Sequence, residues 1–430
     1  MIGMLGMGIG LLALAGAPLF VVIGAGALLG FYAVDIESWA VIIEVYRLAS
    51  SPTLVALPLF AFAGYLLAES GTPQRLVALA HAFFGWIPGG VAVVTLITCA
   101  AFTAFTGASG VTIIALGGLL FPILQQDGYP ENFSLGLLTS SGSLGLLFPP
   151  SLAIILYGVV SQTPIDQLFQ GGLLPGLLLI VLLTIYSIWK GRKANVPTQP
   201  FAIGKALKAV RDAAWELPLP VIVLWGIYGG YFTPTEAASI TAFYVLVVEV
   251  FIYREIKLFG DVPRIMQESM LLVGGILIIL GVALGLTSYL ILEEVPMKIL
   301  EFMQGYLTSK LAFLIVLNIF LLIVGCLMDI FSATFVVVPL ILPIAAGFGV
   351  HPVHLGIIFL TNLEIGYSTP PVGINLFISS FRFRKPVVTL YRAAVPFLLV
   401  LIFGLLIITY FPSLSLWLVD ESTATISSSF

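Results

Sequence analysis

Long apolar runs, separated by short polar connectors, recur along almost the whole sequence. Of its 430 residues, 60% are hydrophobic and 9% are charged, a composition that excludes a soluble globular protein. A helix needs about 20 apolar residues to cross the hydrocarbon core of a bilayer. The sequence therefore predicts an all-α, multi-pass membrane protein with roughly a dozen segments. We place these segments at 3–33, 52–69, 88–106, 109–124, 133–161, 171–190, 214–232, 237–253, 271–292, 311–328, 330–349, 354–381 and 393–418.

The first apolar run and the two cysteines add detail to this predicted membrane protein. The first run has no charged residues ahead of it and is too long for a cleaved signal, so we expect a retained segment. Cys99 and Cys326 both lie in apolar runs. Their positions favour two small buried side chains over a disulfide framework or a thiolate metal site.

Positive charges indicate which connectors face the cytoplasm. Six of the 17 Lys and Arg residues lie between Trp189 and Arg211, and others cluster at 254–264 and 382–392. Short connectors rich in Lys and Arg stay cytoplasmic, so we place these three inside. The connectors 161–172 and 293–310 are acidic or mixed, and we place them outside.

This placement constrains the paired apolar segments at 88–124 and 311–349. If 70–88 and 125–128 lie inside, and 293–310 and 350–353 lie outside, each pair must leave and return on one face of the membrane. We therefore predict two re-entrant helical hairpins, with tips near 107–110 and 325–332.

A shift of 221 residues aligns two parts of the sequence at glycine and proline. Pro122 falls on Pro343, and Gly145 falls on Gly366. The shift also places the pair at 149–150 on the pair at 370–371. Since the connectors that follow these pairs are assigned to opposite sides, we predict an inverted structural repeat.

The repeat predicts the organisation of the chain. The first half spans 1–190, with its hairpin at about 88–124 and an interrupted helix at about 133–161. A cytoplasmic connector at 191–213 leads to the second half at 214–418 and a tail at 419–430. The second half repeats the pattern, with a hairpin at about 311–349 and an interrupted helix at about 354–381.

Paired prolines inside an apolar segment break the helix, and the freed backbone groups need partners where water is absent. Interrupted helices at matching positions of inverted halves indicate the binding site of a secondary transporter. Backbone carbonyls and hydroxyls there suit a sodium ion, and half-helix N-termini suit an anionic substrate. The candidate oxygens and close-approach positions on the breaks are Ser141, Ser143, Gly145, Asn362, Gly366, Ser368 and Thr369. Those at the facing tips are Gly107–Gly110, Gly325, Asp329, Ser332 and Thr334.

Several residues admit a second interpretation. Asp329 and Glu364 are ionisable groups at inferred membrane depth and hence functional candidates, but each can instead cap a half-helix or support a neighbouring group. Ser109 lies in a Gly-x-Ser-Gly pattern similar to that of intramembrane serine proteases. The histidines lie near connectors, so no base is within reach of Ser109 and we expect no enzyme. A channel is disfavoured, because no filter-like repeat or charged ring is present.

Longer motifs resemble the large membrane subunit of tripartite ATP-independent periplasmic (TRAP) transporters. These are "PLFAFAGYLLAESGTPQRLVALAHAFFGWIPGG" at 58–90, "LGLLFPPSLAIILYGVV" at 144–160, "YFTPTEAASI" at 231–240 and "HPVHLGIIFLTNLEIGYSTPPVGINLF" at 351–377. The resemblance implies a sodium-driven importer of a small organic acid, such as a C4-dicarboxylate or sialic acid, in a bacterial or archaeal inner membrane. It also implies elevator-type transport and two partners, a small four-helix membrane subunit and an extracytoplasmic substrate-binding protein. No cofactor besides the coupling Na⁺ and no nucleic acid is expected, and a single-component sodium/carboxylate symporter is the alternative.

The family's sodium sites lie between each hairpin tip and the facing interrupted helix. The resemblance thus implies a first site at Gly107, Ser109, Gly110, Ser141, Ser143 and Gly145. It implies a second site at Gly325, Asp329, Ser332, Asn362, Gly366 and Thr369. The substrate region is expected at Ser109, Ser141, Pro149, Thr334 and Pro370. Both tips depart from the family pattern, since the first lacks a Ser-Gly-Ser-Ser run and the second lacks a proline after Asp329.

Overall fold

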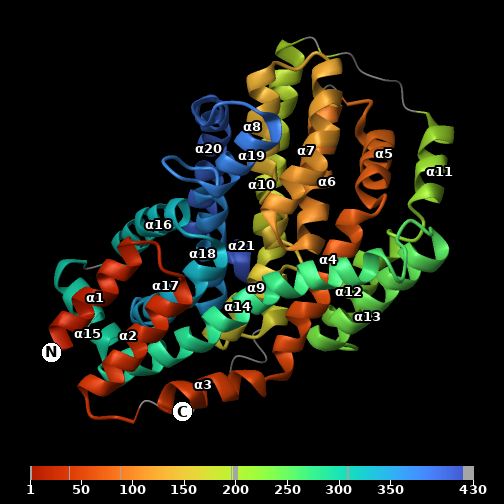
Figure 1. The fold of residues 1–430 in the computed structure, drawn as a ribbon. Helices are drawn as coiled ribbons and strands as arrows, with labels where there is room; N and C mark the ends of the chain where they lie inside the picture. Colours follow the sequence, from red (N-terminus) through yellow and green to blue (C-terminus); the bar gives the residue numbers. More distant parts are fainter. Residues whose placement is uncertain are drawn as a thin grey trace.

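The computed structural model describes residues 2–37, 39–87, 89–194, 196, 202–307 and 309–419, and within these ranges it contains helices and no strand (Figure 1). The predicted all-α class is confirmed. The helices are α1 (Ile2–Leu14), α2 (Leu19–Ala33), α3 (Trp39–Ala49), α4 (Ala56–Glu69), α5 (Thr72–Phe84), α6 (Gly90–Thr106), α7 (Ser109–Gln126), α8 (Glu131–Ser141), α9 (Leu152–Ser161), α10 (Ile165–Lys193), α11 (Ile203–Asp212), α12 (Pro218–Tyr228), α13 (Pro234–Val247), α14 (Asp261–Leu292), α15 (Val295–Tyr306), α16 (Lys310–Leu327), α17 (Ile330–Gly347), α18 (Pro352–Gly366), α19 (Ile374–Phe383), α20 (Val387–Tyr410) and α21 (Ser413–Leu416). Short 3₁₀ helices η1 (Pro52–Val55) and η2 (Leu144–Leu147) and a π-helix η3 (Val248–Ile252) complete them.

In the described part of the chain, seven helices are long and apolar enough to cross a membrane, which supports a multi-pass membrane protein. They are α7, α10, α13 with η3, α14, α16, α17 and α20. The bent pair α8 and α9 raises the number to eight. Roughly a dozen segments were predicted, but several of them form helices of 10–17 residues, which are too short to cross a bilayer alone.

The N-terminal region differs from the prediction of one segment at 3–33. It forms two packed helices, α1 and α2, joined by a turn that contains Gly16 with φ 84° and Pro18. The proline disfavours helical backbone in the residue before it, so the chain turns there. Helix α3, which was not predicted, follows and exposes Trp39, Ile42 and Tyr46. The N-terminal apolar residues therefore form an outer layer of short helices.

The longest helix, α14, runs across the molecule and organises this outer layer (Figure 1). It has 32 residues and begins at Asp261, ten residues before the predicted segment. It packs against α2, α3 and α4, and α4 in turn packs against α13.

The inner bundle contains the two helices that precede the predicted breaks. Every residue of α18 from Val353 to Gly366 is buried, as is every residue of α8 from Phe133 to Ser141. Because these residues are buried on every side of the helix, both helices lie in the core of the bundle. Helix α8 packs against α20, and α18 packs against α16, α10 and α20.

The helix pairs α6–α7 and α16–α17 are hairpins in the structure. The two ends of the first lie together, because a Cβ added at Gly89 would be 3.4 Å from the Tyr129 hydroxyl. The two ends of the second are joined by Lys310, whose Nζ donates a hydrogen bond of 2.6 Å to the Gly349 carbonyl. Each chain segment therefore returns to the end of the bundle where it started.

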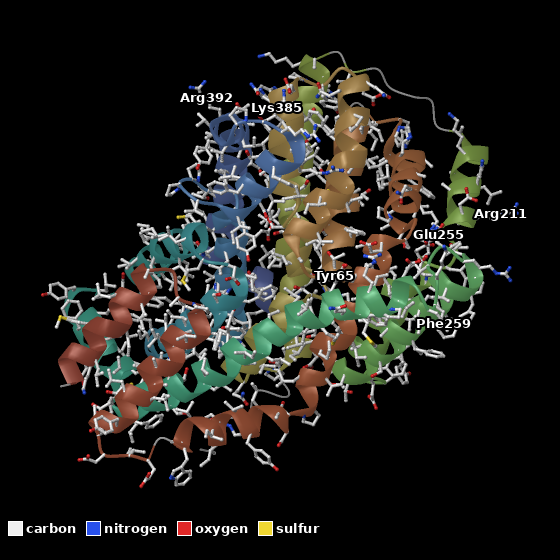
Figure 2. All side chains as sticks on the ribbon, viewed as in Figure 1. Tyr65, Arg211, Glu255, Phe259, Lys385 and Arg392 are labelled. Carbon is white, nitrogen blue, oxygen red and sulfur yellow. The ribbon has the colours of Figure 1, made fainter. Side chains whose placement is uncertain are left out.

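Basic residues gather at one end of the bundle. Lys385 and Arg392 lie where α8 and α20 begin, and Lys385 forms an ion pair with Glu131 (Figure 2). The C-terminus of α10, with Lys190, reaches the same end, since a Cβ at Gly191 would be 2.8 Å from the Cα of Gly89. This clustering agrees with the assignment of these connectors to one side of the membrane.

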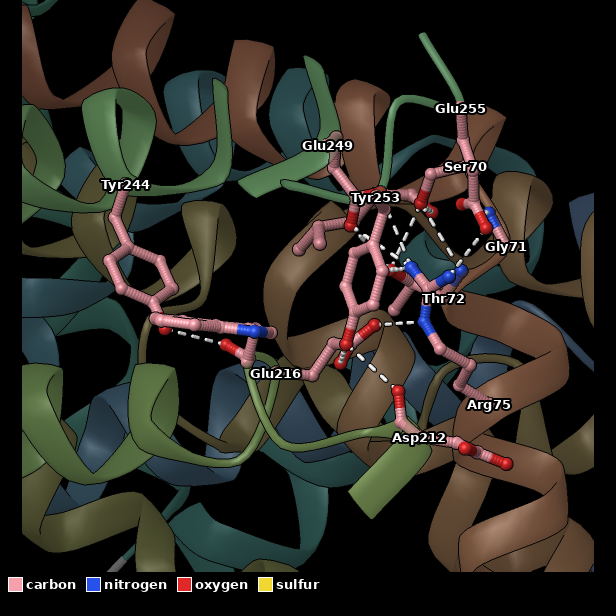
Figure 3. A network of polar contacts seen from close by, with 12 residues as sticks. Ser70, Gly71, Thr72, Arg75, Asp212, Glu216, Tyr244, Glu249, Tyr253 and Glu255 are labelled. Carbon is pink, nitrogen blue, oxygen red and sulfur yellow. Dashed lines mark hydrogen bonds and ion pairs between the residues drawn. The ribbon is translucent and has the colours of Figure 1, made fainter. Parts of the chain in front are cut away.

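A polar cluster fixes the start of α5 to the outer layer (Figure 3). Arg75, whose side chain is 12% exposed, forms ion pairs with Glu216, Glu249 and Glu255. Its guanidinium carbon also lies 3.8 Å from the ring centroid of Tyr253. Burial raises the pKa of the Tyr253 hydroxyl, which donates a 2.8 Å hydrogen bond to Glu216. One guanidinium therefore binds three carboxylates that lie 141 to 180 residues away from it in the sequence.

Candidate functional site

The first hairpin tip is the short non-helical link between α6 and α7. Gly107 has φ 65°, a left-handed conformation that glycine adopts without steric cost. A Cβ at Gly107 would lie 2.6 Å from the Leu152 side chain at the start of α9, and one at Gly110 would lie 2.8 Å from Ile378 in α19. The tip therefore touches both the first break and the helix that follows the second break.

The first break separates α8 from α9, which are bent by 47° relative to each other. The α6 side of the hairpin contacts this break at two glycines. Thr103 donates a 2.8 Å hydrogen bond to the Gly142 carbonyl, and a Cβ at Gly145 would lie 2.3 Å from the Ala100 carbonyl oxygen. Pro149 is buried in the same break. Only glycine fits at 145, because a carbonyl on a packed helix cannot retreat.

The second hairpin tip, Met328–Asp329, links α16 to α17. Asp329 is the N-cap of α17, and its Oδ1 accepts hydrogen bonds of 3.0 Å from the backbone N–H groups of Phe331 and Ser332. The Ser332 hydroxyl also bonds to Asp329. The capping role considered for Asp329 in the sequence is thus the one that the geometry shows, and its role as a sodium ligand stays a prediction.

The second break lies between α18 and α19 and contacts the second tip through the backbone. A Cβ at Gly366 would lie 2.5 Å from the carbonyl carbon of Gly325. Gly373 donates a 3.0 Å hydrogen bond from its backbone to the Cys326 carbonyl, and the Tyr367 hydroxyl accepts one from the backbone of Ile330. These bonds satisfy backbone groups that the broken helices leave free.

The two breaks also meet each other. The Ser143 hydroxyl donates a hydrogen bond of 3.4 Å to the Glu364 carbonyl, across the 221-residue spacing of the sequence repeat. At the first tip, the Ser109 hydroxyl donates a 2.8 Å hydrogen bond to Oδ1 of Asn375 in α19. The same Asn375 donates through Nδ2 to the Thr139 carbonyl, at 3.5 Å. Both tips and both breaks thus belong to one buried region.

Ser368 donates a 3.5 Å hydrogen bond to the Thr139 carbonyl of α8, whereas three other predicted hydroxyls bond to the preceding turn of their own segment. Ser141 donates to the Leu138 carbonyl at 3.5 Å, Thr334 to the Ile330 carbonyl at 2.6 Å and Thr369 to the Ile365 carbonyl at 2.8 Å. Hydroxyls bonded in this way satisfy the backbone, while their oxygen lone pairs stay free to accept or to coordinate a cation. Pro370 is half-buried in the second break.

Free oxygen atoms concentrate in this region. Among the described residues, several fully buried side-chain oxygens at the tips and breaks have no hydrogen-bond partner in the protein. They are Thr106 Oγ1, Ser140 Oγ, Ser151 Oγ, Asn362 Oδ1 and both carboxylate oxygens of Glu364. No Lys or Arg occurs in 100–112, 139–152, 325–334 or 362–375. Unpaired oxygens without a protein cation nearby fit a hard cation such as Na⁺.

Sequence reasoning missed several residues that organise the region. Thr103, Asn375 and Asn318 each bond to a predicted site residue or to its break. Asn375 lies in the motif at 351–377 that marks the family resemblance, so it was within reach of the sequence. Thr103 and Asn318 lie in apolar helices, with no local signal besides their polarity.

Comparison with known proteins identifies the family. Residues 5–414 match the tripartite ATP-independent periplasmic transporter family, DctM component. The chain is 37% identical to the C4-dicarboxylate TRAP transporter large permease protein DctM of Pseudomonas aeruginosa, covering 91% of this chain and 92% of that protein. It is 33% identical to the ectoine/5-hydroxyectoine TRAP transporter large permease protein UehC of Ruegeria pomeroyi, over 95% of this chain and 96% of that protein.

Two further similarities extend this result. The isethionate TRAP transporter permease protein DctMQ of Oleidesulfovibrio alaskensis is 36% identical over 96% of this chain, which spans 63% of that protein. The fold is similar to that of the Alcanivorax borkumensis YdaH transporter, with a TM-score of 0.60 over 88% of this chain and 87% of that one, at 15% identity. The motifs noted in the sequence and these matches agree, and the chain belongs to the family of TRAP transporter large permease subunits.

Proposed function

We propose that this permease subunit couples the entry of Na⁺ to the import of a small organic acid. The observation that carries the proposal is the buried region in which both hairpin tips and both helix breaks meet, through Ser109–Asn375 and Ser143–Glu364, beside unpaired oxygens. Such a region offers cation ligands at two places and helix N-termini for an anion.

The proposed sodium sites retain the predicted residues. The first comprises Gly107, Ser109, Gly110, Ser141, Ser143 and Gly145, and the second comprises Gly325, Asp329, Ser332, Asn362, Gly366 and Thr369. Their support is that each hairpin packs on its own break, at Gly145 in the first half and at Gly366 in the second. The substrate would dock between them, near Ser109, Ser141, Pro149, Thr334 and Pro370.

The proposal includes an inverted repeat and an elevator-type movement. Helix bounds support the repeat, since α7 (Ser109–Gln126) shifted by 221 residues covers 330–347, the bounds of α17. The same shift carries α6 onto α16, α8 onto α18 and α10 onto α20 to within a few residues. We propose that α6–α10 and α16–α20 move as one body relative to the outer layer around α14.

The proposed substrate class follows from relatives and from the charges of the site. The relatives are named for C4-dicarboxylates, isethionate and ectoine, all of which carry an acidic group. Since no Lys or Arg lies in the four segments, binding of the acid group would depend on helix N-termini and on Na⁺ itself. Sialic acid belongs to the same chemical class.

The family implies a small membrane subunit and a periplasmic binding protein as partners. One relative, DctMQ, is longer than this chain, and we propose that a separate small subunit completes the present permease. The complex would work in the inner membrane of a bacterium or archaeon, surrounded by lipid.

Uptake by reconstituted proteoliposomes tests the proposal. Vesicles with this chain and its small partner would receive radiolabelled malate, succinate, isethionate, ectoine or sialic acid, with and without a Na⁺ gradient and the binding protein. Uptake that requires both, and that falls for Ser143→Ala or Asn362→Ala, is the expected result. Uptake without the binding protein would favour a single-component symporter, and uptake that ignores the Na⁺ gradient would contradict sodium coupling.

A further inference from the structure

The side-chain amide of Asn362 has one possible orientation. Its Nδ2 lies 2.9 Å from the carbonyl oxygen of Ile358, one turn earlier in α18, and 2.7 Å from Oδ1 of Asn318 in α16. A carbonyl oxygen can only accept, so the atom that faces Ile358 must be the amide nitrogen. Both N–H groups of Asn362 are therefore used, and Oδ1 is its free polar atom.

Asn318 is held in turn by α20. Its Nδ2 donates a 3.1 Å hydrogen bond to the Thr409 hydroxyl, while its Oδ1 accepts from Asn362. Asn318 is 5% exposed, and Asn362 and Thr409 are fully buried. The three side chains form a relay from α20 through α16 to α18, and this relay determines where the Asn362 oxygen lies.

An amide oxygen that is buried without a donor destabilises the folded protein. Oδ1 of Asn362 is such an atom, and the backbone of Asn362 lies at the second tip, since a Cβ at Gly325 would be 3.3 Å from its carbonyl oxygen. A free acceptor at this place attracts a cation and repels a carboxylate. The amide orientation therefore favours Na⁺ over the substrate acid as the ligand of Asn362.

We propose that Asn318, held by Thr409, is a positioning residue that presents the Asn362 oxygen to Na⁺ at the second site. The inference rests on the proposed function, because it needs a sodium site that includes Asn362. Asn318 itself is not proposed as a ligand, because its Nδ2 donates to Thr409 and its Oδ1 accepts from Asn362 and lies 3.5 Å from the Thr409 hydroxyl oxygen. Its loss leaves the Asn362 amide held by the Ile358 carbonyl alone, so that the oxygen of Asn362 is less firmly positioned for the ion.

Sodium binding to the purified permease, followed by titration calorimetry and by ²²Na⁺ retention, tests the inference. Asn318→Leu is expected to raise the sodium Kd about tenfold, and Thr409→Val is expected to raise it about threefold, because Asn318 then keeps one of its two contacts. Thr361→Val is the matched control, since Thr361 is fully buried in α18 but bonds only to the Ile357 carbonyl of its own helix. In sodium-driven uptake, half-saturation by Na⁺ should rise while the rate at saturating Na⁺ is retained.

A double-mutant cycle with Asn362→Leu separates the possible failures. If Asn318 acts through Asn362, adding Asn318→Leu to Asn362→Leu causes no further rise in Kd. If Asn362→Leu raises the Kd but Asn318→Leu does not, the relay is wrong although the proposed site stands. If Asn362→Leu leaves the Kd unchanged, Asn362 is no ligand, and both the relay and the second sodium site as proposed are wrong. Should Asn318→Leu not fold in sodium-free buffer, Thr409→Val decides, and a Kd equal to that of Thr361→Val overturns the inference.

Discussion

The two tip-and-break pairs contain the same order of elements but are held together differently. Both halves have a close backbone approach, of Gly325 to Gly366 in the second and of Gly145 to the Ala100 carbonyl in the first. In the second half, the backbone of the tip region makes the further bonds, from Gly373 to the Cys326 carbonyl and from Ile330 to the Tyr367 hydroxyl. In the first half, side chains donate the further bonds, from Thr103 to the Gly142 carbonyl and from Ser109 to Asn375 in the other half. Backbone contacts tolerate little displacement, whereas hydroxyl contacts can exchange partners.

The helices that lead into the two hairpins differ even more. Helix α5, ahead of the first hairpin, is anchored by Arg75 and three carboxylates. Helix α15, ahead of the second, takes part in no ion pair among the described residues, and Lys298 there donates only to the Glu293 carbonyl. Helices α5 and α15, which align in the repeat, thus differ in how firmly they are held. The first half combines a firmly anchored helix ahead of its hairpin with a tip that can exchange its hydrogen-bond partners.

Removing the anchor of α5 should have the largest effect. Arg75→Ala leaves Glu249, which is fully buried, without its cation, and the free energy of unfolding is expected to fall by about 3–5 kcal/mol. Chemical denaturation in detergent measures this loss. Arg264→Ala is the control, because Arg264 pairs with Glu69 and Glu268 at the surface, where solvent screens the ion pairs, and its loss should change stability little. Equal losses for the two variants would show that the buried cluster anchors α5 no more strongly than a surface ion pair does, and α5 would then not differ from α15 in this respect.

The backbone contact of the second half comes next. Gly366→Ala places a Cβ 2.5 Å from the backbone of Gly325, and we expect a loss of about 1–3 kcal/mol together with impaired sodium binding. Gly145→Ala tests the corresponding position of the first half, where the Cβ would lie 2.3 Å from the Ala100 carbonyl. Gly274→Ala in α14, with open space around it, should be neutral or stabilising in the same chemical denaturation assay.

A smaller effect is expected at the first tip. Ser109→Ala removes the hydroxyl that bonds to Asn375, and the buried bond is worth on the order of 1–2 kcal/mol. Because this bond joins the two halves, uptake should fall more than thermal stability does. Ser239→Ala, which removes an exposed hydroxyl bonded within α13, should change neither. Full uptake by Ser109→Ala would show that the first tip does not depend on α19.

The smallest effect separates the two roles of Asp329. As an N-cap alone, Asp329→Ala should cost about 1 kcal/mol of stability, and Asp329→Asn should cost almost nothing because asparagine caps equally well. Sodium binding by the Asn variant is the decisive measurement. An unchanged Kd would leave Asp329 with its capping role, and a large rise would establish it as a ligand of the second site.

Local chemistry explains which features were predictable. The apolar runs indicated the helices, the sides assigned to the connectors indicated the hairpin links near Gly107 and Met328–Asp329, and the paired prolines indicated the breaks at 142–151 and 367–373. The N-terminal run was wrongly predicted as one segment, because a hydropathy pattern does not reveal a turn such as the one at Gly16. Asp329 was ambiguous because a carboxylate beside a half-helix can cap it or bind a cation, and composition does not distinguish the two.

Composition and motifs are enough to identify the membrane class and the family. The paired prolines also locate the helix breaks, because backbone conformation at glycine and proline is a local property. Which polar side chains meet depends on the assembled fold. Arg75 finds Glu216 and Glu249, and Asn362 finds Asn318, across long separations in the chain. A buried polar atom in the bundle cannot hydrogen-bond to water and must find a partner in the protein. Packing brings these partners together, so the contacts form only when the helices assemble.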